Sequence, residues 1–308
     1  MSDKYSQMFD GIVEKAKSLK TPMRVALAGS ESENILLGLF DAQADGFAEP
    51  VLIGNYKKTM EILEKHGLSD RKFDFQPIPG DTSPVQYAIE MINAGNADCL
   101  LRGNTQTRDF LLPILYKSNH FHDDGLLSHV VLVSVPGYHK LLAISDVTII
   151  IKPSMEQRIE EIKNMVKALN LFGVKHPNIA LLSMVEKPSF HIRDSVEAST
   201  IIQQHAEEPI ADCNIVGPIT YDLIISKEAA ELKHYKNECC GNFDGIIVPE
   251  LMAGNLMMKV LLHNTDANAC GLIVGGKVPI AIPGRSDRKE QTYLSLATCA
   301  CQWMGSQG

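Results

Sequence analysis

A chain of 308 residues, 45% of them hydrophobic and 21% charged, has the composition of a folded globular protein and enough length for two domains. The net charge of −8, with basic residues spread along the chain, argues against nucleic-acid and anionic-membrane partners, although a few gathered cations can still bind a small anion. The N-terminal segment lacks the apolar stretch of a signal peptide, and no run approaches the roughly 20 apolar residues that span a bilayer, so a cytoplasmic location is expected. Seven cysteines without a CxxC pair predict neither a disulfide framework nor a zinc site.

Short, nearly continuous apolar runs alternate with helical patterns, which is typical of strands buried on both faces of a parallel sheet. The predicted strands are residues 23–29, 49–54, 97–103, 129–135, 147–151, 178–185 and 243–250, followed by the apolar runs 270–276 and 278–284. The clearest helical pattern covers residues 154–173, with Ser154 as its N-cap and Gly173 just past its end. The sequence therefore predicts an α/β fold.

Two interruptions suggest where one domain passes into another. Residues 135–140 (VPGYHK) separate a predicted strand from an apolar run, and Pro283-Gly284 ends the last predicted strand. Neither proline nor glycine continues regular structure easily. We therefore expect a discontinuous first domain of residues 1–137 and 284–308, and a second domain of residues 138–283.

Polar residues after the strands are the first binding candidates, because ligands of open α/β sheets lie beyond the carboxyl ends of strands. The strand at 97–103 leads into a cation, a glycine that lets a ligand approach the backbone, and amide and hydroxyl donors: Arg102, Gly103, Asn104, Thr105 and Thr107. A capped βα turn with a surface arginine explains the same residues. The turn at residues 27–34 is a phosphate-binding candidate or a plain helix cap, since Glu31 and Glu33 oppose an anion.

Two smaller groups follow farther along the chain. Ser128 and His129 enter a strand, where His129 is a candidate general base or a structural histidine. Gly254 and Asn255 open a helix, where Asn255 is a helix cap or a ligand contact.

The densest group of charges follows the last predicted strand. Residues 285–290 (RSDRKE) supply three cations and two carboxylates, which indicates either an anion site with an acid or base nearby or a solvated first helical turn. The candidates there are Arg285, Ser286, Asp287 and Glu290. The chain has neither a P-loop nor a GxGxxG fingerprint, so nucleotide hydrolysis and dinucleotide oxidoreduction lose support. These patterns alone indicate an anion-binding α/β enzyme.

Several blocks taken together resemble the phosphate acetyltransferase and phosphate butyryltransferase family, and its butyryl branch more closely. The blocks are residues 127–146, 177–187, 216–222, 241–259 and 275–297. The resemblance implies a fold like that of the isocitrate and isopropylmalate dehydrogenases, with mainly parallel sheets, an active-site cleft between two domains, and a homodimer or larger homo-oligomer. It also implies an acyltransferase that reversibly moves a short-chain acyl group, such as butyryl, from coenzyme A to inorganic phosphate. No metal and no permanently bound cofactor are implied, coenzyme A being substrate or product.

The site residues are carried over by their place in the matching motifs. Arg285 aligns with the arginine of the family's S-R signature and is expected to bind phosphate or the oxyanion, while Asp287 or Glu290 is the candidate base. Residue types that differ from the family pattern stand at four positions: Gly284 for a serine, Leu112 for an arginine, Arg102 for a lysine and Val216 for an aspartate.

These departures leave an alternative open, a catalytically impaired paralogue that binds acyl-CoA or acyl phosphate in a regulatory or scaffolding role. The preferred acyl chain length does not follow from the sequence.

Overall fold

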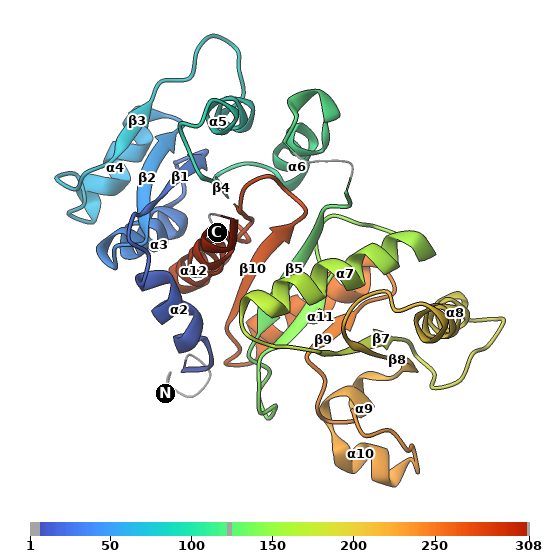
Figure 1. Ribbon diagram of the computed structural model, residues 1–308. Helices are drawn as coiled ribbons and strands as arrows, with labels where there is room; N and C mark the ends of the chain where they lie inside the picture. The colour runs from blue at the N-terminus through green and yellow to red at the C-terminus, as the bar shows by residue number, and fades with distance from the viewer. Residues whose placement is uncertain (1–6, 122–124, 307–308) are drawn as a thin grey trace. The chain divides into compact units, whose positions relative to one another are not determined.

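The computed structural model describes residues 7–121 and 125–306, which form two compact units (Figure 1). Among the described residues, the N-terminal unit consists of residues 9–121, 125–127 and 270–306, and the central unit contains residues 7–8 and 128–269. The chain thus changes units between Met8 and Phe9, between Leu127 and Ser128, and between Ala269 and Cys270, whereas the predicted crossings are at 137/138 and 283/284. Residues 1–6, 122–124 and 307–308 of the first predicted domain lie outside the described part.

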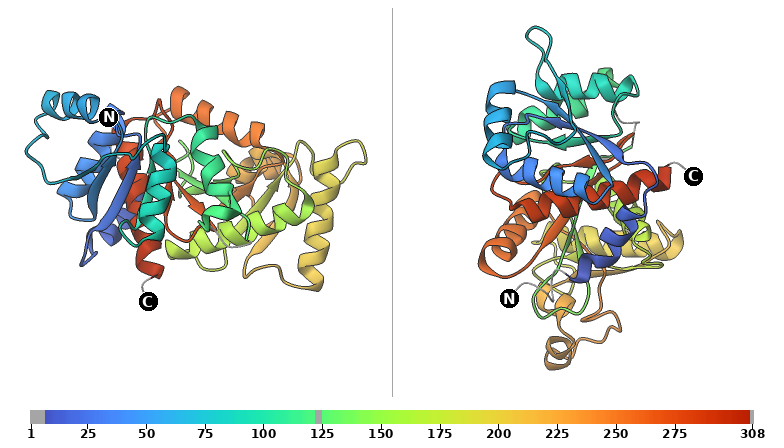
Figure 2. Two further views of the ribbon diagram at one scale, coloured as in Figure 1. Left: turned by 90° about the horizontal axis from the view of Figure 1, so that it is seen from above. Right: turned by 90° about the vertical axis from the view of Figure 1, so that its left-hand side faces the viewer.

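The N-terminal unit has a sheet in the order β3-β2-β1-β4-β11-β10, in which every neighbouring pair is parallel except β10 and β11. Its strands are β1 (Met23–Ala28), β2 (Ala48–Ile53), β3 (Asp74–Gln76), β4 (Cys99–Arg102), β10 (Ala269–Val274) and β11 (Ile280–Ala281). Its helices are α2 (Asp10–Lys17), α3 (Glu33–Ala44), α4 (Tyr56–Lys65), α5 (Pro84–Asn93), α6 (Thr107–Leu115) and α12 (Lys289–Ser306), with the short 3-10 turn η2 (Lys117–Asn119). A further 3-10 turn, η1 (Gln7–Phe9), directly precedes α2 in the chain. The last helix, α12, packs against α2 and α3 (Figure 1 and Figure 2).

The central unit has a sheet in the order β5-β6-β9-β7-β8, parallel except for the antiparallel pair β5 and β6. Its strands are β5 (Ser128–Val133), β6 (Leu142–Ser145), β7 (Asn178–Leu182), β8 (Asn214–Ile219) and β9 (Gly245–Ile247). Its helices are α7 (Met155–Leu171), α8 (Arg193–Glu207), α9 (Tyr221–Ile225), α10 (Lys227–Leu232) and α11 (Leu251–Asn264).

Successive residues of β9 face opposite sides of this sheet. Gly245 lies against Met165 of α7, whereas Ile246 belongs to the apolar cluster that also contains Met258 of α11. The helices α7 and α11 therefore cover opposite faces (Figure 1).

The structure confirms the α/β class and the mainly parallel sheets, and it confirms the helix after Ser154, whose side chain forms a capping box with Gln157. The likeness to isocitrate and isopropylmalate dehydrogenases and the cleft between domains stay predictions. Two strands were not predicted, the three-residue β3 and the six-residue β8.

The strand predicted at residues 147–151 is wrong, because the strand here is β6, which ends at Ser145. The next residue, Asp146, accepts hydrogen bonds at one carboxylate oxygen from the amides of Thr148 and Ile149, both at 2.6 Å. This local side-chain turn ends the extended backbone despite the β-branched residues that follow.

Candidate functional site

Three parallel strand ends meet on one edge of the N-terminal sheet. The strand β4 pairs in parallel with both β1 and β11, so the loops that follow these strands leave the same edge. The amide of Asn104 donates to the carbonyl of Gly29 at 2.7 Å, which joins the loops after β4 and β1. The side-chain amide of Asn34 donates to the carbonyl of Asp287 at 3.0 Å, which joins the start of α3 to the loop after β11. Residues predicted from distant parts of the sequence are therefore brought together.

Gly103 is where the loops after β1 and β4 approach most closely. A Cβ added at Gly103 would lie 1.9 Å from the carbonyl oxygen of Gly29, whose own φ of +88° also favours glycine. Neither position accepts a side chain without moving backbone, so both glycines are needed for the two loops to stack.

Arg102 shapes its own loop. It is 5% exposed, and its guanidinium donates through Nε and Nη2 to the carbonyl of Thr105, at 3.1 and 2.8 Å. Thr107 is the first residue of α6, and the Asn104 side chain is exposed. The alternative of a surface arginine is thus wrong, because Arg102 is buried and holds the turn, while its role in substrate binding stays a prediction and Asn104 is presented to solvent.

Arg285 lies on the exposed side of the loop after β11. Within the described residues, no hydrogen bond or ion pair holds its guanidinium, yet its charge acts on Arg102. Burial, and then the positive charge of Arg285, lower the pKa of Arg102 from its ordinary value, and the carboxylate of Asp287 opposes this. Two guanidinium groups and one carboxylate therefore share this edge, where an added anion would relieve the repulsion between the cations.

Asp287 closes the loop after β11 on itself. Its carboxylate accepts a hydrogen bond from the amide of Gly284 at 2.7 Å, and its amide donates to the Gly284 carbonyl at 3.0 Å. A Cβ at Gly284 would lie 2.5 Å from a carboxylate oxygen of Asp287, so this carboxylate fills the place of the family's serine side chain. Ser286 and Glu290 are exposed, and Glu290 belongs to the first turn of α12.

In the turn after β1, the first serine after the strand has no hydroxyl available to a ligand. The hydroxyl of Ser30 is buried and shares a 2.8 Å hydrogen bond with Thr59, and the cap position of α3 is Ser32, whose side chain makes no capping bond. Ser30 is thus a packing residue. The helix-cap alternative holds for the position of Ser32, though without a capping bond, and phosphate binding at this turn stays a prediction.

The other predicted residues belong to the central unit. Ser128 is fully buried and accepts a hydrogen bond from the Asn164 side chain at 3.0 Å. His129 is also buried, with Nδ1 2.8 Å from the hydroxyl of Thr148. Burial lowers the pKa of His129 to about 3, so the imidazole is neutral near pH 7 and a weak base. The structural alternative fits His129 better than the general base.

Gly254 and Asn255 lie inside the first turns of α11, whose N-cap is Glu250, so the prediction that they open the helix is wrong. A Cβ at Gly254 would lie 2.6 Å from the carbonyl oxygen of Asp146, and the side chain of Asn255 donates to the carbonyl of Val147 at 3.2 Å. Both residues hold α11 against the loop after β6, and Asn255 does not cap the helix.

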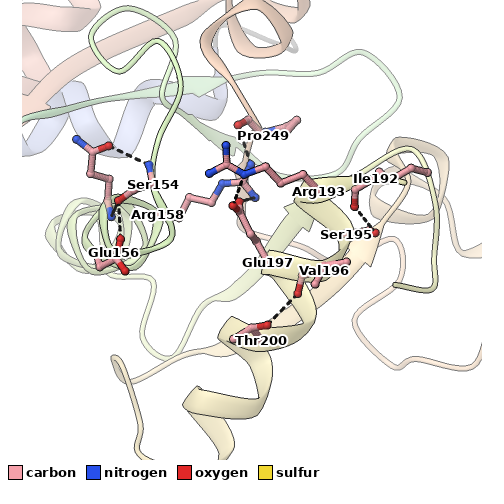
Figure 3. A network of polar contacts seen from close by, with 11 residues as sticks. Ser154, Glu156, Arg158, Ile192, Arg193, Ser195, Val196, Glu197, Thr200 and Pro249 are labelled. Atoms are coloured by element: carbon pink, nitrogen blue, oxygen red, sulfur yellow. Dashed lines mark hydrogen bonds and ion pairs between the residues drawn. The ribbon is translucent and has the colours of Figure 1, made fainter. Parts of the chain in front are cut away.

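A buried charged group on α7 was not predicted. Arg158 is 5% exposed, donates to the carbonyl of Pro249 at 2.7 Å and lies 3.6 Å from a carboxylate oxygen of Glu197 on α8, which also binds Arg193 (Figure 3). One turn farther, Glu161 is 1% exposed, and neither carboxyl oxygen has a partner among the described residues.

Burial chiefly, and then the charge of Asp146, raise the pKa of Glu161 to about 8, while Arg158 opposes the rise. The sequence carried a signal for these residues, because Arg158 and Glu161 recur at helical spacing with the buried Ile162 and Met165.

No metal site is evident in the described parts of the chain, where no three His, Cys, Asp or Glu side chains are grouped to hold an ion. Within residues 7–121 and 125–306, no helix has the length and apolar character needed to cross a membrane.

A family model described as phosphate acetyl/butaryl transferase matches residues 80–300, more than half of the chain. The chain belongs to this family. The resemblance predicted from the sequence blocks is therefore confirmed, and with it the enzyme class, a phosphate acyltransferase.

Individual relatives agree with the family. The phosphate butyryltransferase of Clostridium acetobutylicum is 28% identical over 292 residues, covering 95% of this chain and 97% of the relative. The crystal structure of a branched-chain phosphotransacylase from Enterococcus faecalis V583 superposes with a TM-score of 0.78 at 26% identity, covering 91% of this chain and 99% of that one. A phosphotransacetylase from Streptococcus pyogenes has the same TM-score at 20% identity, covering 99% and 100%, and shows the shared fold.

Proposed function

We propose that this phosphate acyltransferase reversibly transfers a short-chain acyl group, butyryl or similar, between coenzyme A and inorganic phosphate. The observation that carries the proposal is the parallel pairing of β4 and β11, which brings the loops that carry Arg102 and Arg285 to one edge, where the charge of Arg285 helps to lower the pKa of Arg102. An anion that binds between two such cations gains charge-assisted hydrogen bonds. We assign phosphate to this edge, with the exposed amide of Asn104 and the hydroxyls of Thr105, Thr107 and Ser286 as further donors.

The reaction needs the negative charges of phosphate and of the forming oxyanion to be neutralised, and it needs no covalent enzyme intermediate. A phosphate oxygen attacks the thioester carbonyl carbon, the carbon–sulfur bond breaks, and the coenzyme A thiolate leaves and takes a proton. Arg285 offsets the charge of the phosphate and of the oxyanion that forms on the carbonyl oxygen, while Arg102 keeps the loop shaped to receive them. The roles of Ser128, His129, Gly254 and Asn255 in substrate binding stay predictions, as do the cytoplasmic location and the homodimer.

In the reverse direction, a carboxylate must accept the proton of the thiol, whose pKa is about 8.5. Asp287 is already the acceptor of the Gly284 amide, which ties it into the turn. Glu290 is exposed, and no such bond to its carboxylate is found in the described part of the chain. We therefore place Glu290 ahead of Asp287 as the base, and Glu290→Gln should lower the rate of acyl phosphate use more than Asp287→Asn does.

The test is phosphate-dependent release of free thiol from butyryl-CoA, followed with a chromogenic disulfide. Loss of a charged hydrogen bond is worth about 1.5 to 3 kcal/mol, so Arg285→Ala should lower kcat/KM by roughly 10- to 100-fold. Arg71→Ala, which removes an exposed arginine of the same unit between α4 and β3, is the matched control. Equal activity of the two variants would contradict the proposed role of Arg285.

The alternative, a catalytically impaired paralogue, is favoured by one observation. The carboxylate of Asp287 occupies the space of the missing serine side chain at Gly284, so no hydroxyl reaches that point. Binding of coenzyme A without turnover of acyl-CoAs of any chain length would support this alternative.

A further inference from the structure

The position of Arg285 depends on the backbone that carries it. Among the residues that the structure describes, none forms a hydrogen bond or an ion pair with its guanidinium. A long side chain without such partners samples many rotamers, and ordering it on a ligand costs entropy. The affinity of the anion site therefore depends on how firmly the turn that bears Arg285 is held.

Residues 284–287 form a closed β-turn with Arg285 and Ser286 at its centre. The amide of Asp287 donates to the carbonyl of Gly284 at 3.0 Å, and the carboxylate of Asp287 accepts from the amide of Gly284 at 2.7 Å. The turn follows β11, which pairs with β4. The sheet thus fixes one end of the turn, and the contacts of Asp287 decide where the other end lies.

The helix α3 holds this second end through Asn34. The side-chain amide of Asn34, in the first turn of α3, donates to the carbonyl of Asp287 at 3.0 Å. Asp287 uses its amide and its carboxylate inside the turn, and its carbonyl reaches α3. The hydrogen bond joins residues that are 253 positions apart in the sequence, and both belong to the N-terminal unit.

The same face of α3 packs against the segment that follows the turn. Positions 34, 38 and 41 have the spacing of one helical face. A Cβ added at Gly38 would lie 2.6 Å from the carbonyl oxygen of Lys289, and the ammonium group of Lys289 lies 2.9 Å from a carboxylate oxygen of Asp41. The helices α3 and α12 therefore lie side by side (Figure 1), and Asn34 extends their contact to the turn itself.

We propose that Asn34 is a positioning residue for phosphate binding, which acts by holding the turn that carries Arg285. The inference rests on the proposed function, because the ligand is the phosphate assigned to Arg285. Asn34 itself does not touch the substrate. It fixes the Asp287 end of the turn, so that the guanidinium meets the anion without the cost of first ordering the backbone.

The experiment measures the dissociation constant of inorganic phosphate by calorimetry and its KM in the thiol-release assay. Asn34→Ala should raise both by about threefold to tenfold, the worth of one neutral hydrogen bond, and should leave the KM of butyryl-CoA within about twofold. Alanine is the best helix former, so a weaker α3 would not explain such a loss.

Asn93→Ala is the matched control. The exposed side chain of Asn93, the last residue of α5, donates to the carbonyl of Asn119 at 2.8 Å in the same unit, which is the same kind of bond between two segments. This variant should keep the phosphate constants of the wild type.

A double-mutant cycle tests whether Asn34 acts through Arg285. Once Arg285→Ala has removed the guanidinium, adding Asn34→Ala should change the phosphate dissociation constant by less than about twofold. Two effects that multiply in the double variant would overturn the inference. An Asn34→Ala variant that binds phosphate as the wild type does would also overturn it, and a lowered thermal midpoint in that variant would then mean that the bond only stabilises the fold.

The outcomes also separate this inference from the proposed function. If the wild type binds phosphate but releases no thiol from butyryl-CoA, the proposed function fails, while the phosphate dissociation constants still test Asn34. If the wild type binds no phosphate, the site that Asn34 is proposed to position does not exist, and both proposals fail.

Discussion

Replacing Glu161 with glutamine probes a carboxyl group that is buried without a partner in the central unit. The pKa of Glu161 rises from 4.5 to about 8, chiefly through burial. The folded protein therefore keeps a proton that the unfolded chain releases above pH 4.5, and the free energy of unfolding falls as the pH rises toward 8. At about 1.4 kcal/mol per pH unit, the loss is about 3 kcal/mol at pH 7 and about 5 kcal/mol above pH 8.

Glutamine keeps the shape of the protonated carboxyl and has no proton to lose. We expect Glu161→Gln and the wild type to be equally stable near pH 4.5, and the variant to be more stable by about 3 kcal/mol near pH 7. Since whole domains are stable by about 5 to 15 kcal/mol, this difference is large. The protonated carboxyl confers its full stability below the pKa of the unfolded chain, 4.5. This stability is lost as the pH rises through the pKa of the folded protein, about 8.

The assay is urea unfolding by circular dichroism at about pH 5, 7 and 9. The fluorescence of Trp303, the only tryptophan, reports separately on α12 of the N-terminal unit. Glu160→Gln is the matched control, because that neighbouring side chain is 44% exposed and pairs with Lys163. If the gain from Glu161→Gln does not depend on pH, the carboxyl is not the retained proton and the reasoning is refuted.

Two further predictions concern the glycines of the anion site. Gly103→Ala should destabilise the N-terminal unit by about 3 kcal/mol or more, measured by urea unfolding, because its Cβ would meet the Gly29 carbonyl at 1.9 Å; an unchanged midpoint would contradict the close approach. Gly284→Ser should preserve the fold, since only the flexible end of Asp287 must move, and should raise phosphate-dependent thiol release several-fold by adding a hydroxyl. Lower activity with intact folding would show that activity depends more on the hydrogen bond from the Gly284 amide to Asp287 than on an added hydroxyl at residue 284.

Most strands were predictable because their residues are buried on both faces, and an uninterrupted apolar run is what such burial selects. The strand at β6 was misplaced because the run at residues 147–151 is richer in β-branched residues than the real strand. The side chain of Asp146 ends the strand, because it accepts hydrogen bonds from two following amides. Hydrophobic periodicity does not reveal such a turn.

The residues of the anion site were predictable as strand-end residues, whereas their environments were not. Arg102 is predicted either to bind a ligand or to lie on the surface, and it is buried against its own loop. His129 looked like a possible base, yet tertiary packing removes it from water and keeps it neutral. Burial depends on neighbours from distant parts of the chain. For the same reason, the burial of the Glu161 carboxyl was not predicted from the sequence.

The anion site is assembled from segments made at different times during synthesis. The ribosome makes the loops after β1 and β4 early, then the whole central unit, and only afterwards the loop that carries Arg285. A nascent chain that stops short of β11 has no second guanidinium at that edge and leaves β4 without one neighbour. Translation of the final segment therefore sets the earliest moment at which the proposed phosphate site can form.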